Sequence, residues 1–245
     1  MKPLIGITTV WSPELDLCEV FDEFYYINCA YIKAIFAAGG IPVLMPPPKA
    51  EEVDLEAHAD ELLASLDAVY FAGGGTVGKR KNPVDPKPRP LYEQQPVRSK
   101  WEDILLKKAY ALDMPITGAC RGHQMIAEAL GGALDADYYP PHKQQMPYYE
   151  GHHTVKLAQN SLLSSLVGPE DWFVNSVHTQ AVEKLPEGFI VSAWTEDGSV
   201  EAIESTEKTF VLGTQFHPEM MVYDARAQKV LQAFVAAAKA YSQRK

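Results

Sequence analysis

The sequence predicts an α/β fold with a mostly parallel central sheet that is covered by helices on both faces. Short apolar runs alternate with segments of helical periodicity, and several of these runs end in glycine or proline turns. A length of 245 residues and a hydrophobic content of 47% suit one large domain over residues 1–245. Such a chain can bury a core without disulfides or metals.

Each element of the first half follows from its own pattern. Apolar runs predict strands at Pro3–Val10, Ile41–Met45, Leu66–Phe71 and Met114–Ala119. Helical spacing predicts helices at Phe24–Ala38, Ala50–Ser65, Trp101–Leu112 and Gly122–Leu130. Between them, Thr76–Arg98 is rich in proline and shows no apolar periodicity, so it is expected to form a long surface loop.

The second half is richer in strand patterns. Strands are expected at Gly151–Leu157, Asp171–Val174, Phe189–Trp194, Val200–Ser205 and Phe210–Gln215. An alanine-rich amphipathic helix at Arg226–Tyr241 closes the chain.

Charge and composition narrow the classes of protein. The formal net charge of −10 argues against nucleic acid as a partner and is compatible with a small-molecule enzyme. No apolar run approaches a membrane span, and the N-terminal segment predicts a buried strand instead of a signal peptide. The three cysteines form an odd set without metal-ligand spacing, as expected in a reducing compartment, so we expect a cytoplasmic protein.

The sharpest local pattern is Gly118-Ala119-Cys120-Arg121-Gly122, which places a cysteine between a strand and a helix with a glycine two residues to either side. This is the pattern of a nucleophile elbow, whose tight turn requires small neighbours. The start of a helix favours a thiolate through its free amides and its dipole. We therefore predict Cys120 as a nucleophile, and we interpret Cys18 and Cys29 as buried structural cysteines.

A cysteine nucleophile needs a base, and the base needs an orienting group. His217 ends the last predicted strand in Gln215-Phe216-His217-Pro218-Glu219. Pro218 favours an extended conformation at His217, and residues two apart in an extended segment face the same side. The sequence therefore predicts that Glu219 accepts a hydrogen bond from the imidazole of His217. The alternative is a solvated turn histidine beside an unrelated carboxylate.

Taken together, the motifs resemble the class I glutamine amidotransferase superfamily, with its flavodoxin-like fold, and within it the γ-glutamyl-γ-aminobutyrate hydrolase-like peptidases of the C26 type. The matching segments run in the family's order along almost the whole chain: Tyr31 with 38–44, Gly73-Gly74-Gly75, Arg98 with Trp101-Glu102, 116–124 with 129–132, 174–182, and 215–219.

The resemblance implies a role for each matching position. Cys120 would be the nucleophile, His217 the base and Glu219 its orienting group. The amides of Gly74 and Arg121 would form the oxyanion hole. The residues that hold the glutamyl α-amino and α-carboxylate groups would be Gln124, Asn175, Ser176 and His178. From the residues alone, Gln124 could equally lie on a helix surface, and Asn175-Ser176 could be a plain turn.

The chain departs from the family pattern on the leaving-group side of the substrate. Thr76 and Ser99 stand where aspartate is usual, and His123 stands where the hydrolases often carry an apolar residue. The remaining histidines, His58, His142, His152 and His153, show no metal-ligand spacing, and Lys79–Lys81 is interpreted as a solvated loop face. We expect no metal and no cofactor.

Two enzymatic functions fit these features. The leading one is hydrolysis of γ-glutamyl amides through a γ-glutamyl thioester, with polyamine-derived compounds as candidate substrates by resemblance. The second is a glutaminase subunit that delivers ammonia to a separate synthetase. A binding protein with an inactive site is disfavoured because all three triad positions are filled. The expected partner is a small γ-glutamyl molecule, and homo-oligomerisation stays open.

Overall fold

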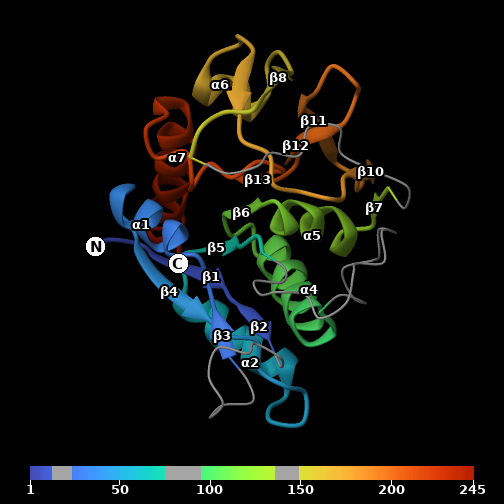
Figure 1. Cartoon of the computed structure of the whole chain (residues 1–245). Helices are drawn as coiled ribbons and strands as arrows, with labels where there is room; N and C mark the ends of the chain where they lie inside the picture. The colour runs from blue at the N-terminus through green and yellow to red at the C-terminus, as the bar shows by residue number, and fades with distance from the viewer. Residues whose placement is uncertain (13–23, 75–94, 136–148) are drawn as a thin grey trace.

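A computed structural model describes residues 1–12, 24–74, 95–135 and 149–245. Its centre is a nine-stranded sheet in the order β4-β1-β5-β6-β13-β12-β11-β8-β9 (Figure 1). The parallel strands are β4 (Ile41–Met45), β1 (Leu4–Thr8), β5 (Ala68–Phe71), β6 (Ile116–Ala119) and β13 (Val211–Thr214). An antiparallel extension follows, made of β12 (Val200–Ser205), β11 (Phe189–Trp194), β8 (His153–Leu157) and β9 (Trp172–Val174).

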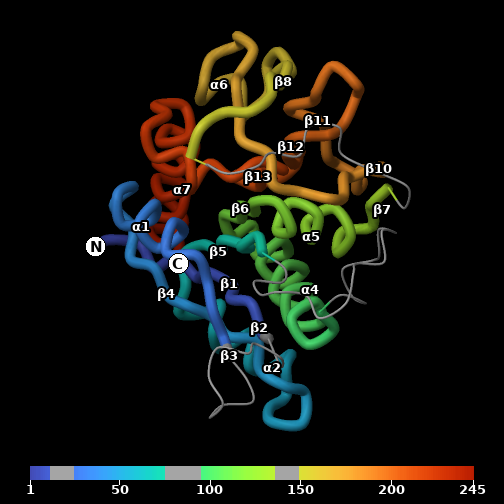
Figure 2. Tube along the Cα trace, viewed as in Figure 1, coloured from blue at the N-terminus to red at the C-terminus, as the bar shows by residue number. Residues whose placement is uncertain are grey.

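Helices cover both faces of this sheet, which confirms the predicted α/β class (Figure 2). One face packs against α1 (Cys29–Ala37), α6 (Leu162–Val167) and α7 (Ala225–Ser242). The other face packs against α2 (Leu55–Ser65), α4 (Pro96–Ala111) and α5 (Arg121–Ala129). Two short antiparallel pairs lie outside the main sheet: β2 (Val10–Ser12) with β3 (Phe24–Tyr26), and β7 (Ala133–Leu134) with β10 (Val182–Lys184).

Two predicted helices begin later than expected because side-chain caps fix their starts. The side chain of Asn28 accepts a hydrogen bond from the amide of Ala30, so α1 begins at Cys29, and the residues at 24–26 pair as β3 instead. Asp54 caps α2 in the same way, so the helix predicted from Ala50 begins at Leu55.

The predicted surface loop Thr76–Arg98 is wrong at its end, because α4 begins at Pro96 and Arg98 is fully buried within it. The rest of that loop up to residue 94 lies outside the described residues, together with Lys79–Lys81. The short elements α6, β7 and β10 had no counterpart in the prediction. Within the described part of the chain, no helix combines the length and apolar character needed to cross a membrane.

Candidate active site

Cys120 occupies a strained turn between β6 and α5. Its backbone has φ +53° and ψ −107°, a conformation that residues with a side chain rarely adopt. The flanking glycines are required by close packing. A Cβ added at Gly122 would lie 1.9 Å from the carbonyl oxygen of Phe71, and one at Gly118 would lie 2.6 Å from the carbonyl carbon of Gly122. The predicted elbow therefore exists as a tight strand-to-helix turn.

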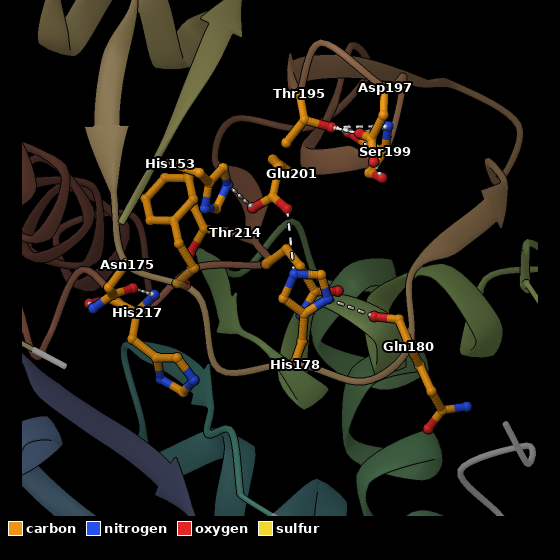
Figure 3. Close-up of polar contacts among 12 residues, drawn as sticks. His153, Asn175, His178, Gln180, Thr195, Asp197, Ser199, Glu201, Thr214 and His217 are labelled. Atoms are coloured by element: carbon orange, nitrogen blue, oxygen red, sulfur yellow. Dashed lines mark hydrogen bonds and ion pairs between the residues drawn. The ribbon is translucent and has the colours of Figure 1, made fainter. Parts of the chain in front are cut away.

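His217 lies three residues beyond β13, and its ring is held by the predicted carboxylate. Its Nδ1 lies 2.6 Å from Oε1 of Glu219, and both side chains are buried. The backbone of His217 is fixed by Asn175: the amide of His217 donates to Oδ1 of Asn175 at 2.8 Å, and Nδ2 of Asn175 donates to the His217 carbonyl at 3.1 Å (Figure 3). The His-Pro-Glu segment thus presents its two side chains together.

The charge state of His217 follows from its neighbours. Burial alone would lower the pKa of His217, but the charge of Glu219 and a hydrogen bond with the Cys120 side chain outweigh it and raise the pKa to about 10. At neutral pH the imidazole is therefore protonated, and it connects Glu219 to Cys120. Cys120, at the end of β6, and the His217–Glu219 pair, just beyond β13, are distant in sequence and are brought together where these two neighbouring strands end.

Two buried tyrosines complete the surroundings of Glu219. The hydroxyl of Tyr70 donates to Oε2 of Glu219 at 3.0 Å. The hydroxyl of Tyr31 accepts from the Gly73 amide at 2.8 Å and lies 3.4 Å from Nδ1 of His217. Burial, and then the charge of Glu219, raise the pKa of both tyrosines well above the usual value, so both keep their protons. Tyr70 was not predicted, because within a buried strand it looks like an ordinary core residue.

The glycine turn after β5 lies beside the elbow. β5 and β6 pair in parallel with Phe71 opposite Gly118, so the chain leaves both strands side by side. A Cβ at Gly73 would lie 2.8 Å from Cε1 of His217 and 3.1 Å from the carbonyl oxygen of Ala119. Gly74 follows with φ +95°, in the region that favours glycine. Two segments with backbone amides, at Gly74 and at Arg121, therefore lie on either side of the turn that carries Cys120.

The residues expected to hold the glutamyl group are all buried. Nε2 of Gln124 donates to the Gln180 carbonyl at 2.9 Å and to Oε1 of Gln215 at 3.0 Å. Nδ1 of His178 lies 2.9 Å from the same Gln180 carbonyl, which brings Gln124 and His178 together. Gln124 is thus no helix-surface residue, and the side chain of Asn175 contacts the backbone of His217. Ser176, which follows Asn175 in the sequence, is also fully buried.

A second buried cluster lies behind His178 and was not predicted. The carboxylate of Glu201 lies 3.4 Å from Nε2 of His178 and 3.6 Å from Nε2 of His153 (Figure 3). His153 therefore lies beside a carboxylate that is fully buried. Burial lowers the pKa of the neighbouring His123 to about 4, so His123 is neutral.

The other candidate ligands and thiols have simple surroundings. Cys29 is exposed at the first turn of α1, so its interpretation as a buried cysteine is wrong. His58 packs its ring near Trp101, and His152 is exposed. Cys18 and His142 lie outside the described residues. Among the residues that are described, no three His, Cys, Asp or Glu side chains are arranged to hold a metal ion.

A cysteine elbow beside a buried His–Glu pair, on an α/β sheet of this order, defines a protein of the class I glutamine amidotransferase type. Residues 3–219 match the sequence model of the family named peptidase C26, and this chain belongs to that family.

Three known proteins illustrate the relationship. A Mycobacterium tuberculosis protein, provisionally named a glutamine amidotransferase, is 35% identical over 245 residues, covering 94% of this chain and 74% of that protein. The γ-glutamyl-γ-aminobutyrate hydrolase of Escherichia coli K12 is 32% identical over 211 residues, covering 77% of this chain and 76% of the hydrolase. A Thermoplasma acidophilum crystal structure, provisionally described as one of the subunits of a GMP synthase, shares the fold with a TM-score of 0.67 at 15% identity, covering 100% of this chain and 98% of that one.

Proposed function

We propose that this protein hydrolyses γ-glutamyl amide bonds with Cys120 as nucleophile, His217 as acid and base, and Glu219 as the group that orients His217. The observation that carries the proposal is the position of the His217 ring, which lies between the Glu219 carboxylate and the Cys120 side chain. A histidine in this position can exchange a proton with a substrate bound at the elbow.

The first half of the reaction forms a thioester. The Cys120 thiolate attacks the γ-carbonyl carbon, and the amides of Gly74 and Arg121 stabilise the oxygen that becomes negative. The protonated His217 then gives its proton to the leaving nitrogen, the C–N bond breaks, and the amine departs. This leaves a γ-glutamyl thioester on Cys120 and a neutral imidazole.

The second half restores the enzyme with water. Neutral His217 takes a proton from a water molecule, whose oxygen attacks the thioester carbonyl. Cys120 leaves as a thiolate, and glutamate departs. The 2.6 Å contact with Glu219 keeps the proton of Nδ1 in place, so that Nε2 is the nitrogen that exchanges protons.

For the substrate, we propose that the glutamyl half is selected more strictly than the amine half. Gln124, Asn175, Ser176 and His178 are buried polar residues, and a substrate that left such groups unpaired would bind poorly. The E. coli relative is named for γ-glutamyl-γ-aminobutyrate, which supports γ-glutamyl compounds derived from amines as substrates. A reduced thiol nucleophile is compatible with a cytoplasmic location.

The test compares kcat/KM for a panel of γ-glutamyl amines and glutamine with that for the matched α-linked compounds. We expect the γ-linked amides to be cleaved and the α-linked compounds to be slower by orders of magnitude. Equal rates for the two linkages would remove the substrate assignment. A Cys120→Ala variant that kept full turnover would remove the proposed mechanism.

A glutaminase subunit of a two-component amidotransferase is the second candidate, since the M. tuberculosis relative is named a glutamine amidotransferase. That function predicts cleavage of glutamine alone, and only when a synthetase protein is present. Turnover of γ-glutamyl amines by the isolated chain would exclude it.

A further inference from the structure

A buried ionic cluster lies directly beneath the elbow and takes no part in the proposed chemistry. It consists of Arg98 and Glu102 on α4 and Arg121 on α5, with exposed fractions of 0%, 0% and 5%. Nε of Arg98 donates to Oε1 of Glu102 at 2.8 Å, and Nη1 of Arg121 donates to Oε2 of the same carboxylate. The two guanidinium groups therefore share one carboxylate, each on its own oxygen.

The Arg98 end of the cluster binds the glycine turn. Its Nη1 donates to the Gly74 carbonyl at 2.9 Å, and its Nη2 donates to the carbonyls of Ala72 at 2.6 Å and Gly73 at 3.3 Å. One side chain thus binds three consecutive carbonyls of the turn. These bonds fix the peptide planes of the turn, and with them the direction of its amides.

The Arg121 end of the cluster fixes the first residue of α5. Besides Glu102, its Nη2 donates to Oγ of Ser99 at 2.7 Å. Both arms of the guanidinium therefore bind α4, in the helical turn that begins with Arg98. The backbone amide of Arg121 follows Cys120 directly, so this anchor acts beside the nucleophile.

The Glu102 carboxylate is the common point of the cluster. Burial alone would raise the pKa of Glu102. The charges of Arg121 and Arg98 and a hydrogen bond from Thr8 outweigh burial and lower the pKa, so the carboxylate is charged. The Thr8 hydroxyl also accepts from the Ala72 amide at 3.0 Å. Glu102 is thereby tied to the glycine turn through Arg98 and through Thr8, and to the elbow through Arg121.

We propose that the Arg98–Glu102–Arg121 cluster is a positioning device that sets the separation of the two oxyanion-hole amides, those of Gly74 and Arg121. The inference rests on the proposed function, which gives these amides their role. The side chains of the cluster bind one another and the two loops, and none of them is given a role in the proposed chemistry. It acts by holding two loops, from β5 and from β6, at a fixed distance, because both are bonded to one carboxylate.

The deciding variant is Arg98→Lys. Lysine keeps the charge, but its single ammonium cannot bind three carbonyls and Glu102 in the planar arrangement of a guanidinium. We expect kcat for a γ-glutamyl amide to fall about 10- to 100-fold with KM within about twofold, because an oxyanion donor acts mainly in the transition state. Asp103→Asn is the matched control: it removes a carboxylate from the same helix, where Asp103 binds Lys107 at 2.8 Å near the surface, and kcat should be unchanged.

A second measurement reads the positions of the amides without any substrate. In ¹⁵N–¹H spectra, Arg98→Lys and Glu102→Gln should each shift the resonances of both Gly74 and Arg121, whereas Asp103→Asn should shift neither. Glu102→Gln leaves two buried guanidinium groups without a carboxylate and can fail to fold, so Arg98→Lys decides alone in that case.

The outcomes separate the two proposals. Unchanged kcat in Arg98→Lys, or a shift confined to Gly74, would overturn the positioning role while leaving the hydrolase intact. A wild-type protein that cleaves no γ-glutamyl amide would overturn the hydrolase, and the paired shifts of Gly74 and Arg121 would then still decide whether the cluster couples the two loops.

Discussion

Replacing Glu219 by glutamine should lower the pKa of His217 and destabilise the protein at neutral pH. The substitution keeps the size of the side chain and removes the charge 2.6 Å from Nδ1 of His217. Burial remains and acts in the opposite direction. A close opposite charge accounts for about one to three pH units, so the pKa should fall from about 10 by that amount.

The consequence for stability follows from the sign of the shift. The folded-state pKa of His217 is raised above its usual 6.5, so its contribution is complete below pH 6.5 and is lost as pH rises through about 10. At pH 6, Glu219→Gln should cost about 1.4–4 kcal/mol in the free energy of unfolding, at about 1.36 kcal/mol per pH unit. Above pH 10, the part of the difference that comes from His217 should disappear.

The assay is an NMR titration of the His217 ring together with denaturant unfolding at pH 6, 8 and 10. Glu183→Gln serves as the control, because Glu183 is an exposed residue of β10 and should change neither result. If the pKa of His217 in Glu219→Gln equalled that of the wild type, the assignment of the high pKa to Glu219 would be refuted.

Three further substitutions probe the same region. Cys120→Ser should abolish turnover while leaving the melting temperature within a few degrees, measured by kinetics and calorimetry; appreciable residual turnover would point to another nucleophile. Tyr70→Phe removes the hydroxyl that donates to Oε2 of Glu219 at 3.0 Å, and should lower the free energy of unfolding by about 1–3 kcal/mol. Urea unfolding measures this difference, and an unchanged free energy of unfolding would contradict this role of the hydroxyl. Gly122→Ala places a Cβ 1.9 Å from the Phe71 carbonyl oxygen and should prevent soluble expression. Gly131→Ala is the control, because a Cβ added there meets nothing within 4 Å. Its effect should be far milder and come only from the strained φ of +100°.

Local patterns in the sequence were enough to predict much of the site. The two glycines around Cys120 indicate a close approach of the backbone, and that approach is now seen between Gly122 and Phe71. The proline after His217 predicts an extended segment, in which residues two apart share a side, and the 2.6 Å contact between His217 and Glu219 follows from it. Each of the two sequence patterns lies within five consecutive positions of the chain, although Phe71 itself belongs to another strand.

Features that depend on distant partners could not be predicted in this way. Asn175 holds the backbone of His217 across 42 positions, and Arg121 meets Glu102 across 19, so no local periodicity reports either pairing. The exposure of Cys29 could not be predicted locally either. Its apolar neighbours suggested burial, but α1 buries the face that carries Tyr31, Ala34 and Ile35.

The amide of Cys120 donates to the carbonyl of Thr214 at 2.8 Å, and Ala119 pairs with Thr214 in the sheet. The strand that receives the backbone of Cys120 therefore also leads to His217, three residues after its end. The pairing of β6 with β13 sets the spacing between positions 120 and 217, independently of the side chains at these two positions. A substitution of Cys120 should therefore leave the register between β6 and β13 unchanged. One residue inserted between Thr214 and His217 would advance the imidazole by about 3.3 Å and turn it to the opposite side.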